Sequence, residues 1–86
     1  MQFTFHSDDG HGWLFVSNEQ LTKLDLRRAS FSSYSYTDGN GVYAEEDCDA
    51  GIVLQTARGM GIDFTYVEKN HAGDAWIRGL ARCIPQ

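Results

Sequence analysis

The chain has 86 residues, 42% of them hydrophobic and only one of them proline, which predicts a single globular domain over residues 1–86. Twelve acidic residues against seven lysines and arginines give a net charge of −5. This balance argues against direct binding to nucleic acid, because affinity for phosphate needs clustered cations. No apolar run is long enough for a membrane span and the N-terminus lacks a signal-peptide layout, so a cytoplasmic location is expected.

The first part of the chain predicts a strand hairpin followed by a helix. Apolar and aromatic residues alternate over 2–6 and again over 13–16, and turn-forming residues separate the two stretches. Ser17 and Gln20 then have the spacing of a capping box. We therefore expect a short helix that begins at Ser17 and ends near Leu26.

The second part of the chain repeats this pattern. Segments 31–36 and 42–45 alternate as strands around a turn rich in glycine and asparagine, and apolar residues at helical spacing predict a helix over 48–59. Segment 62–67 alternates again and predicts a fifth strand. Segment 75–83 is ambiguous, because its apolar residues have helical spacing but a glycine interrupts them.

The resulting order, β-β-α-β-β-α-β with a short C-terminal element, is typical of the α+β class. We expect an antiparallel or mixed sheet of about five strands with two helices packed on one face.

An acidic tract is the most distinctive feature of the composition. No lysine or arginine occurs between Arg28 and Arg58, and this interval holds five of the twelve carboxylates. Like charges this close repel one another, so a helix N-terminus, a metal ion or a basic partner must offset them. Capping and the helix dipole at the predicted second helix account for Asp47 and Asp49. The carboxylates that remain for a partner are Asp38, Glu45 and Glu46.

Tyrosines flank the acidic tract. Tyr34 and Tyr36 alternate with serines, and Tyr43 follows on the next predicted strand. Tyrosine and serine together are typical of adaptable protein-binding surfaces. The alternative is that one set of these aromatic residues faces the core.

Enzymatic alternatives rest on two other groups of residues. A turn with histidines and carboxylates suits a divalent metal, although its spacing matches no established site. A cysteine at a helix start suits a nucleophile, but the flanking acids disfavour a thiolate. The two cysteines are expected to be free thiols, with a disulfide as the alternative. No cofactor motif is present, so no catalytic residue, metal ligand or cofactor is predicted. The metal candidates are His6, Asp8, Asp9 and His11, and the cysteines are Cys48 and Cys83.

Three segments, HGWLFV at 11–16, SYSY at 33–36 and VYAEEDCDA at 42–50, resemble a family of small proteins from proteobacterial genomes, plasmids and other mobile elements. The resemblance extends from His11 to about Arg78. One departure is Gly51, where a larger apolar residue is expected. The resemblance implies a mobile-element setting, in which small acidic proteins often inhibit host defence. Anti-CRISPR proteins are the obvious class, and several of them present carboxylates to the basic nucleic-acid channels of their targets.

These observations predict a non-enzymatic protein-binding domain that contacts a basic partner surface, such as a CRISPR effector subunit. A metal- or thiol-dependent enzyme and a homodimer with a self-complementary sheet edge or aromatic face remain as alternatives. The predicted contact residues are Tyr34, Tyr36, Asp38, Tyr43, Glu45, Glu46, Asp47 and Asp49.

Overall fold

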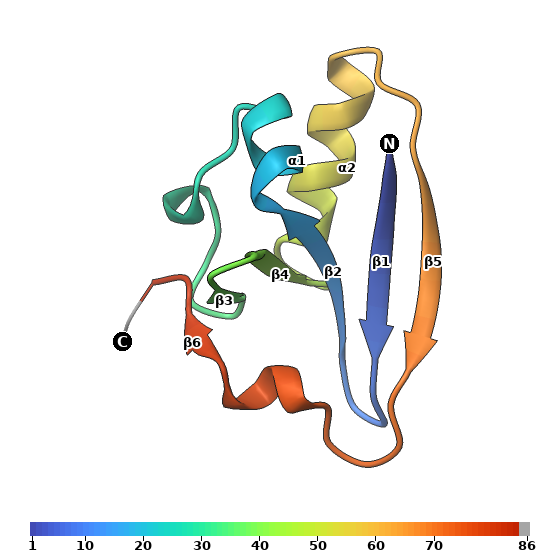
Figure 1. The fold of residues 1–86 in the computed structure, drawn as a ribbon, viewed down its shortest axis with the longest axis vertical. Coiled ribbons are helices and arrows are strands. Elements are labelled where there is room, and N and C mark those ends of the chain that lie inside the picture. Colours follow the sequence, from blue (N-terminus) through green and yellow to red (C-terminus); the bar gives the residue numbers. More distant parts are fainter. Residues whose placement is uncertain (85–86) are drawn as a thin grey trace.

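The computed structural model describes residues 1–84 and has an α+β fold (Figure 1). Its strands are β1 (Gln2–Ser7), β2 (Gly12–Ser17), β3 (Tyr36–Asp38), β4 (Gly41–Glu45), β5 (Thr65–Asn70) and β6 (Ala81–Arg82). Its α-helices are α1 (Asn18–Lys23) and α2 (Ala50–Gly59), and its 3₁₀ turns are η1 (Arg28–Ser30) and η2 (Trp76–Gly79).

The sheet is mixed, which confirms the predicted fold class. The strands lie in the order β5-β1-β2-β4-β3-β6. Neighbouring strands are antiparallel except β1 and β5, which pair in parallel with Gln2 opposite Thr65. The chain therefore leaves one edge of the sheet after β5 and returns to the opposite edge as β6.

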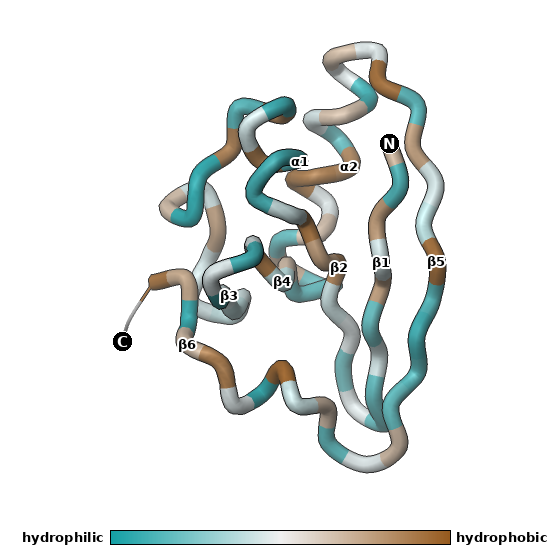
Figure 2. Tube along the Cα trace, viewed as in Figure 1, coloured by the Kyte–Doolittle hydropathy of each residue, from teal (hydrophilic) through white to brown (hydrophobic). Residues whose placement is uncertain are grey.

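Each face of the sheet has its own apolar core. The larger core includes Phe3, Leu14 and Val16 of the sheet together with buried residues of α1 and α2. Figure 2 shows apolar residues on β2 and α2 and hydrophilic residues along the second half of β5. On the other face, Trp13 and Tyr43 pack against Ala75 and Ile77. We call the segment that covers this second face, residues 71–80, the strap.

The predicted capping box is present at α1. The Ser17 hydroxyl accepts a hydrogen bond from the backbone N–H of Gln20 at 3.1 Å, and the Gln20 side chain accepts one from the N–H of Ser17 at 3.0 Å. The helix ends at Lys23, before the predicted Leu26. Asp25 adopts a left-handed conformation with φ of 54°, which an α-helix does not allow.

The strand predicted over 31–36 is wrong. Only Tyr36 of that segment belongs to β3, and the preceding residues form a turn in which the N–H of Ser35 donates to the carbonyl of Ser32. Ser32 and Ser35 of this segment bond to a carboxylate at the start of α2, as described below. Side chain–backbone bonds of this kind compete with strand pairing.

Three other boundaries also differ from the prediction. Helix α2 begins at Ala50 rather than at residue 48, because the preceding turn is closed by a glutamate side chain. Strand β5 begins at Thr65 rather than at residue 62, since Ile62 and Phe64 pack against the helix-side core. The ambiguous segment 75–83 forms η2 and the short edge strand β6.

Candidate functional site

A pocket of about 380 Å³ opens between β2, residues 34–36 at the start of β3, the β4–α2 turn and residues 78–82, which span the end of the strap and β6. Seven of its nine lining residues come from three separate segments of the chain, 11–16, 33–36 and 42–50. Residues far apart in the sequence therefore meet at one place. We call it the Trp13 pocket; it is lined by His11, Trp13, Tyr34, Tyr36, Glu45, Asp47, Cys48, Arg78 and Arg82.

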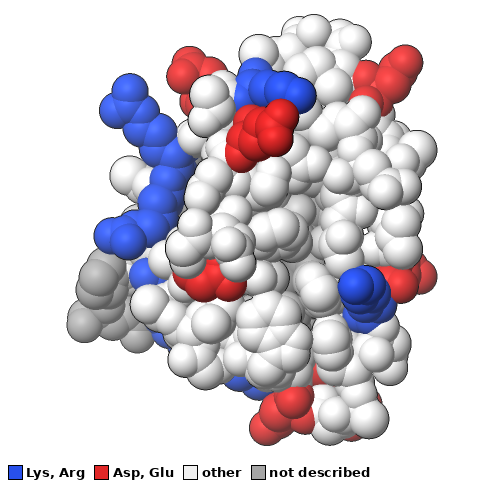
Figure 3. Space-filling model, in the orientation of Figure 1, with Lys and Arg blue, Asp and Glu red and all other residues white. Residues whose placement is uncertain are grey.

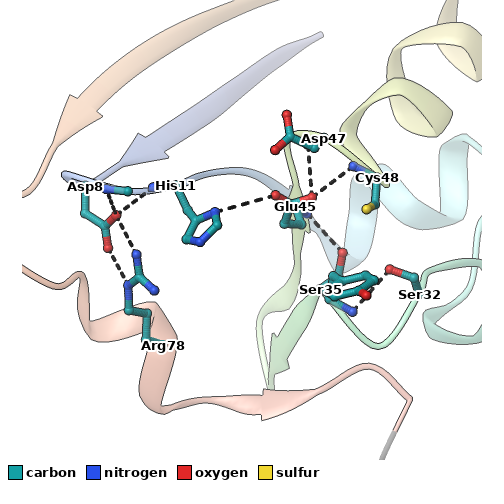
Figure 4. Close-up of polar contacts among 10 residues, drawn as sticks. Asp8, His11, Ser32, Ser35, Glu45, Asp47, Cys48 and Arg78 are labelled. Carbon is teal, nitrogen blue, oxygen red and sulfur yellow. Dashed lines mark hydrogen bonds and ion pairs between the residues drawn. The ribbon is translucent and has the colours of Figure 1, made fainter.

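Glu45 closes the turn between β4 and α2. One of its carboxylate oxygens accepts hydrogen bonds from the backbone N–H groups of Asp47 and Cys48, each at 2.9 Å (Figure 4). The other oxygen lies 3.9 Å from Nδ1 of His11. Glu45 is only 8% exposed. It is therefore an internal group of the turn, and not the exposed acid that the sequence predicted.

Asp49 is also internal. It is 3% exposed, and one carboxylate oxygen accepts bonds from the N–H and hydroxyl of Ser32, at 2.9 and 2.7 Å, and from the hydroxyl of Ser35. The Ser35 hydroxyl in turn accepts the N–H of Glu45 at 3.0 Å. Asp49 occupies the N-cap position of α2 without making a capping bond. The prediction that Asp47 caps this helix is therefore wrong.

Asp38 and Tyr43 lie together and do not line the Trp13 pocket. The Tyr43 hydroxyl donates to Asp38 at 3.1 Å, and Asp38 also accepts the N–H of Asn40 at 2.8 Å. Tyr43 is buried beside Phe15 and Trp76. Burial, and then the charge of Asp38, raise the pKa of Tyr43 to about 12.

Among the predicted contact residues, the exposed ones are few. Tyr34 is 58% exposed and Asp47 is exposed, both at the Trp13 pocket, and Tyr36 is half-buried there. Glu46 is exposed on the opposite side of the sheet, because adjacent residues of an extended chain point to opposite faces. The face shown in Figure 3 carries scattered acidic and basic groups rather than one continuous acidic patch.

Two arginines of the pocket were missed by the sequence analysis. Arg78 forms a two-point ion pair with Asp8, with N–O distances of 2.7 and 2.9 Å, and its guanidinium lies 5.4 Å from the ring centre of Trp13. The hydrogen bond to Arg78 is the main reason that the pKa of Asp8 lies far below its usual range. Arg82 lies 5.0 Å from the ring centre of Tyr36. Both arginines fall in the segment whose pattern was ambiguous, so no local signal identified them.

The predicted metal-binding candidates are not brought together as one ligand set. The Asp8 carboxylate binds Arg78 and the N–H of Ala75, while Nδ1 of His6 lies 3.0 Å from Nε2 of His71. Burial, then the neighbouring His71 and Lys69, lower the pKa of His6. Within residues 1–84, no group of three or more histidines, cysteines or carboxylates is arranged to hold a metal ion.

The thiols are both free, as predicted. Cys48 is exposed at the pocket, yet desolvation of its sulfur, followed by the hydrogen bond and charge of Glu45, raises its pKa. Cys83 is buried, and burial raises its pKa to about 11. At neutral pH both sulfurs are therefore held as protonated thiols, the less nucleophilic form.

No family model matches the chain, and neither the curated proteins nor the solved structures contain a match to it. None of the helices in the described part of the chain is long and apolar enough to cross a bilayer.

Proposed function

We propose that this chain is a non-enzymatic protein-binding domain and that it contacts its partner through the Trp13 pocket and its rim. The convergence of three distant segments on one pocket, with an exposed tyrosine and an exposed carboxylate at its edge, carries the proposal. Those two residues are Tyr34 and Asp47.

The chemistry of the rim favours a basic partner. Tyrosine provides a large contact area at a low cost in side-chain entropy, and a rim carboxylate attracts lysine or arginine and speeds association. Of the two arginines of the pocket, Arg78 is already neutralised by Asp8 and so competes weakly for Asp47, while Arg82 donates to the carbonyl of Ser33. The net charge of −5 adds to the long-range attraction.

The protonation state of the pocket supports binding rather than catalysis. A nucleophilic cysteine needs a depressed pKa, whereas the pKa of Cys48 is raised.

For the partner we propose a nucleic-acid-binding protein of a host defence complex, such as a CRISPR effector subunit. Small size, acidity and the resemblance to mobile-element proteins support this choice. An acidic protein that covers a basic nucleic-acid channel inhibits it by competing with phosphate. The chain is then expected to reduce DNA interference when it is expressed together with such a complex, and unchanged interference would count against this role.

The binding proposal is tested by capturing partners with the tagged chain and with two variants, Tyr34→Ala and Asp47→Lys. Met60→Ala is the matched control, because Met60 is 51% exposed, close to the 58% of Tyr34, but lies beyond α2, away from the pocket. A specific partner, identified by mass spectrometry, should be retained by wild type and Met60→Ala and lost by both pocket variants. Elution of the partner from wild type should depend on salt concentration, because the contact is electrostatic. Equal capture by all four proteins would exclude the pocket as the contact site.

A further inference from the structure

An apolar groove of about 300 Å³ lies on the helix side of the sheet, between α2 and the edge strand β5. Its walls include Phe5 and Leu14 from the sheet, Leu54 from α2 and Tyr66 from β5. Tyr66 remains 51% exposed although its ring lies 6.3 Å from that of Phe5. The groove is on the opposite face from the Trp13 pocket, so it is a separate surface.

Two glycines keep this groove open. At Gly12, a Cβ would collide with the ring of Phe5, so glycine allows this ring to lie against β2. At Gly51, on the first turn of α2, a Cβ would meet nothing within 4 Å. The absence of a side chain at Gly51 leaves space at the groove wall.

The charged groups that line the groove are both acidic. Glu46 comes from the β4–α2 turn and Glu68 from β5, and both are exposed. Lys69, the next residue of β5, lies opposite His6 in the strand register and so belongs to the other face of the sheet. The groove therefore combines an apolar floor with a negative rim.

We propose that this groove binds an extended segment of a partner protein that places a large apolar side chain in the groove, between lysines or arginines. Side chains two residues apart share a face of an extended segment. The apolar side chain fills the space beside Gly51, and the flanking cations meet Glu46 and Glu68. This surface does not depend on the proposed role of the Trp13 pocket.

The test is an NMR titration of the ¹⁵N-labelled chain with a synthetic peptide that has leucine at its centre, lysine two residues to either side and threonine between them. Shifts are expected at the amides of β5 and the first turn of α2. Glu68→Gln should weaken binding several-fold, and Gly51→Leu should weaken it about tenfold or more by filling the groove. Because leucine has a better helix propensity than glycine, Gly51→Leu is expected to remain folded.

Matched controls distinguish this groove from the Trp13 pocket and from general stickiness. A peptide with glutamate in place of lysine should not bind, whereas Tyr34→Ala and Asp47→Lys should bind the lysine peptide as wild type does. The proposal is overturned by the absence of shifts, by equal binding of the two peptides, or by unchanged affinity in Gly51→Leu. It is equally overturned by a concentration-dependent dimer that Gly51→Leu abolishes, which would assign the groove to a second copy of this chain.

Discussion

Individual carboxylates of the acidic tract have internal roles that their neighbours in sequence do not share. Glu45 closes a turn through two backbone N–H groups, and Asp49 ties the β3 region to the start of α2. Hydrogen bonds from N–H and hydroxyl groups offset the cost of burying each negative charge. The repulsion within the tract is thus relieved inside the molecule, and only Glu46 and Asp47 are left to solvent.

Ser35 is the residue on which this arrangement depends most. It is fully buried, donates to Asp49 and accepts from the N–H of Glu45. Ser35→Ala should lower the free energy of unfolding by about 1–3 kcal/mol, because it leaves a buried N–H without an acceptor. Urea unfolding followed by circular dichroism measures the change. Ser30→Ala, at an exposed site, should cost less, and an equal cost for both variants would contradict the role given to Ser35.

The sequence contains enough information for the α1 cap but not for the Ser35 network. Ser17 and Gln20 are three residues apart, so their capping box follows from local spacing. Ser35 and Asp49 are separated by β3, a turn, β4 and a second turn, and nothing local indicates that they meet. The alternation of serine and tyrosine resembled a strand because its hydrogen bonds to α2 cannot be seen in the pattern.

At the scale of elements, the strap is the segment with the least regular secondary structure. Apart from η2 it is irregular, and it is attached to the sheet by side chains and by a backbone hydrogen bond from the N–H of His71 to the carbonyl of Ser7. Asp8 binds both the N–H of Ala75 and the guanidinium of Arg78, while His71 contacts His6. The sequence did not identify the strap as a segment that covers the sheet, because the residues that anchor it lie on β1 and the β1–β2 turn, far away in the chain.

Asp8→Asn should loosen the strap while the sheet beneath it persists. The neutral amide loses the ion pair with Arg78, and one end of the amide presents donors where the carboxylate accepts. Hydrogen exchange read by mass spectrometry should become faster over residues 71–82 and change little over β2 and β4. Asp9→Asn, at the neighbouring exposed position, is the control. Unchanged protection of the strap in Asp8→Asn would show that its apolar contacts suffice.

For the whole molecule, the strap turns a sheet with one covered face into a sheet with two cores. Trp13 and Tyr43 would otherwise face solvent on the side opposite the helices. Sequence analysis predicted the fold class and the helices, because these follow from periodicity. It did not predict the second core, because the C-terminal segment has no clear period and its place is set by tertiary contacts.

The stability of the whole molecule should decrease below about neutral pH through His6. Its pKa in the folded protein lies below the ordinary histidine value of about 6.5, so the unfolded chain takes up the proton first. The contribution of His6 to stability is therefore complete above pH 6.5 and is lost as the pH falls from there through the lowered folded pKa. Thermal unfolding at a series of pH values should show this fall. His6→Gln should flatten it, and an unaltered slope in that variant would exclude His6 as its source.

The parallel pairing of β1 with β5 has a consequence for biosynthesis. Strand β1 emerges from the ribosome first, but one of its two neighbours follows only after β2, β4 and both helices. Such long-range pairing is expected to slow folding. Until β5 arrives, β1 is itself an open edge, so the nascent chain carries an exposed template for aggregation. The sheet is therefore expected to be completed only after β5 and β6 have been translated.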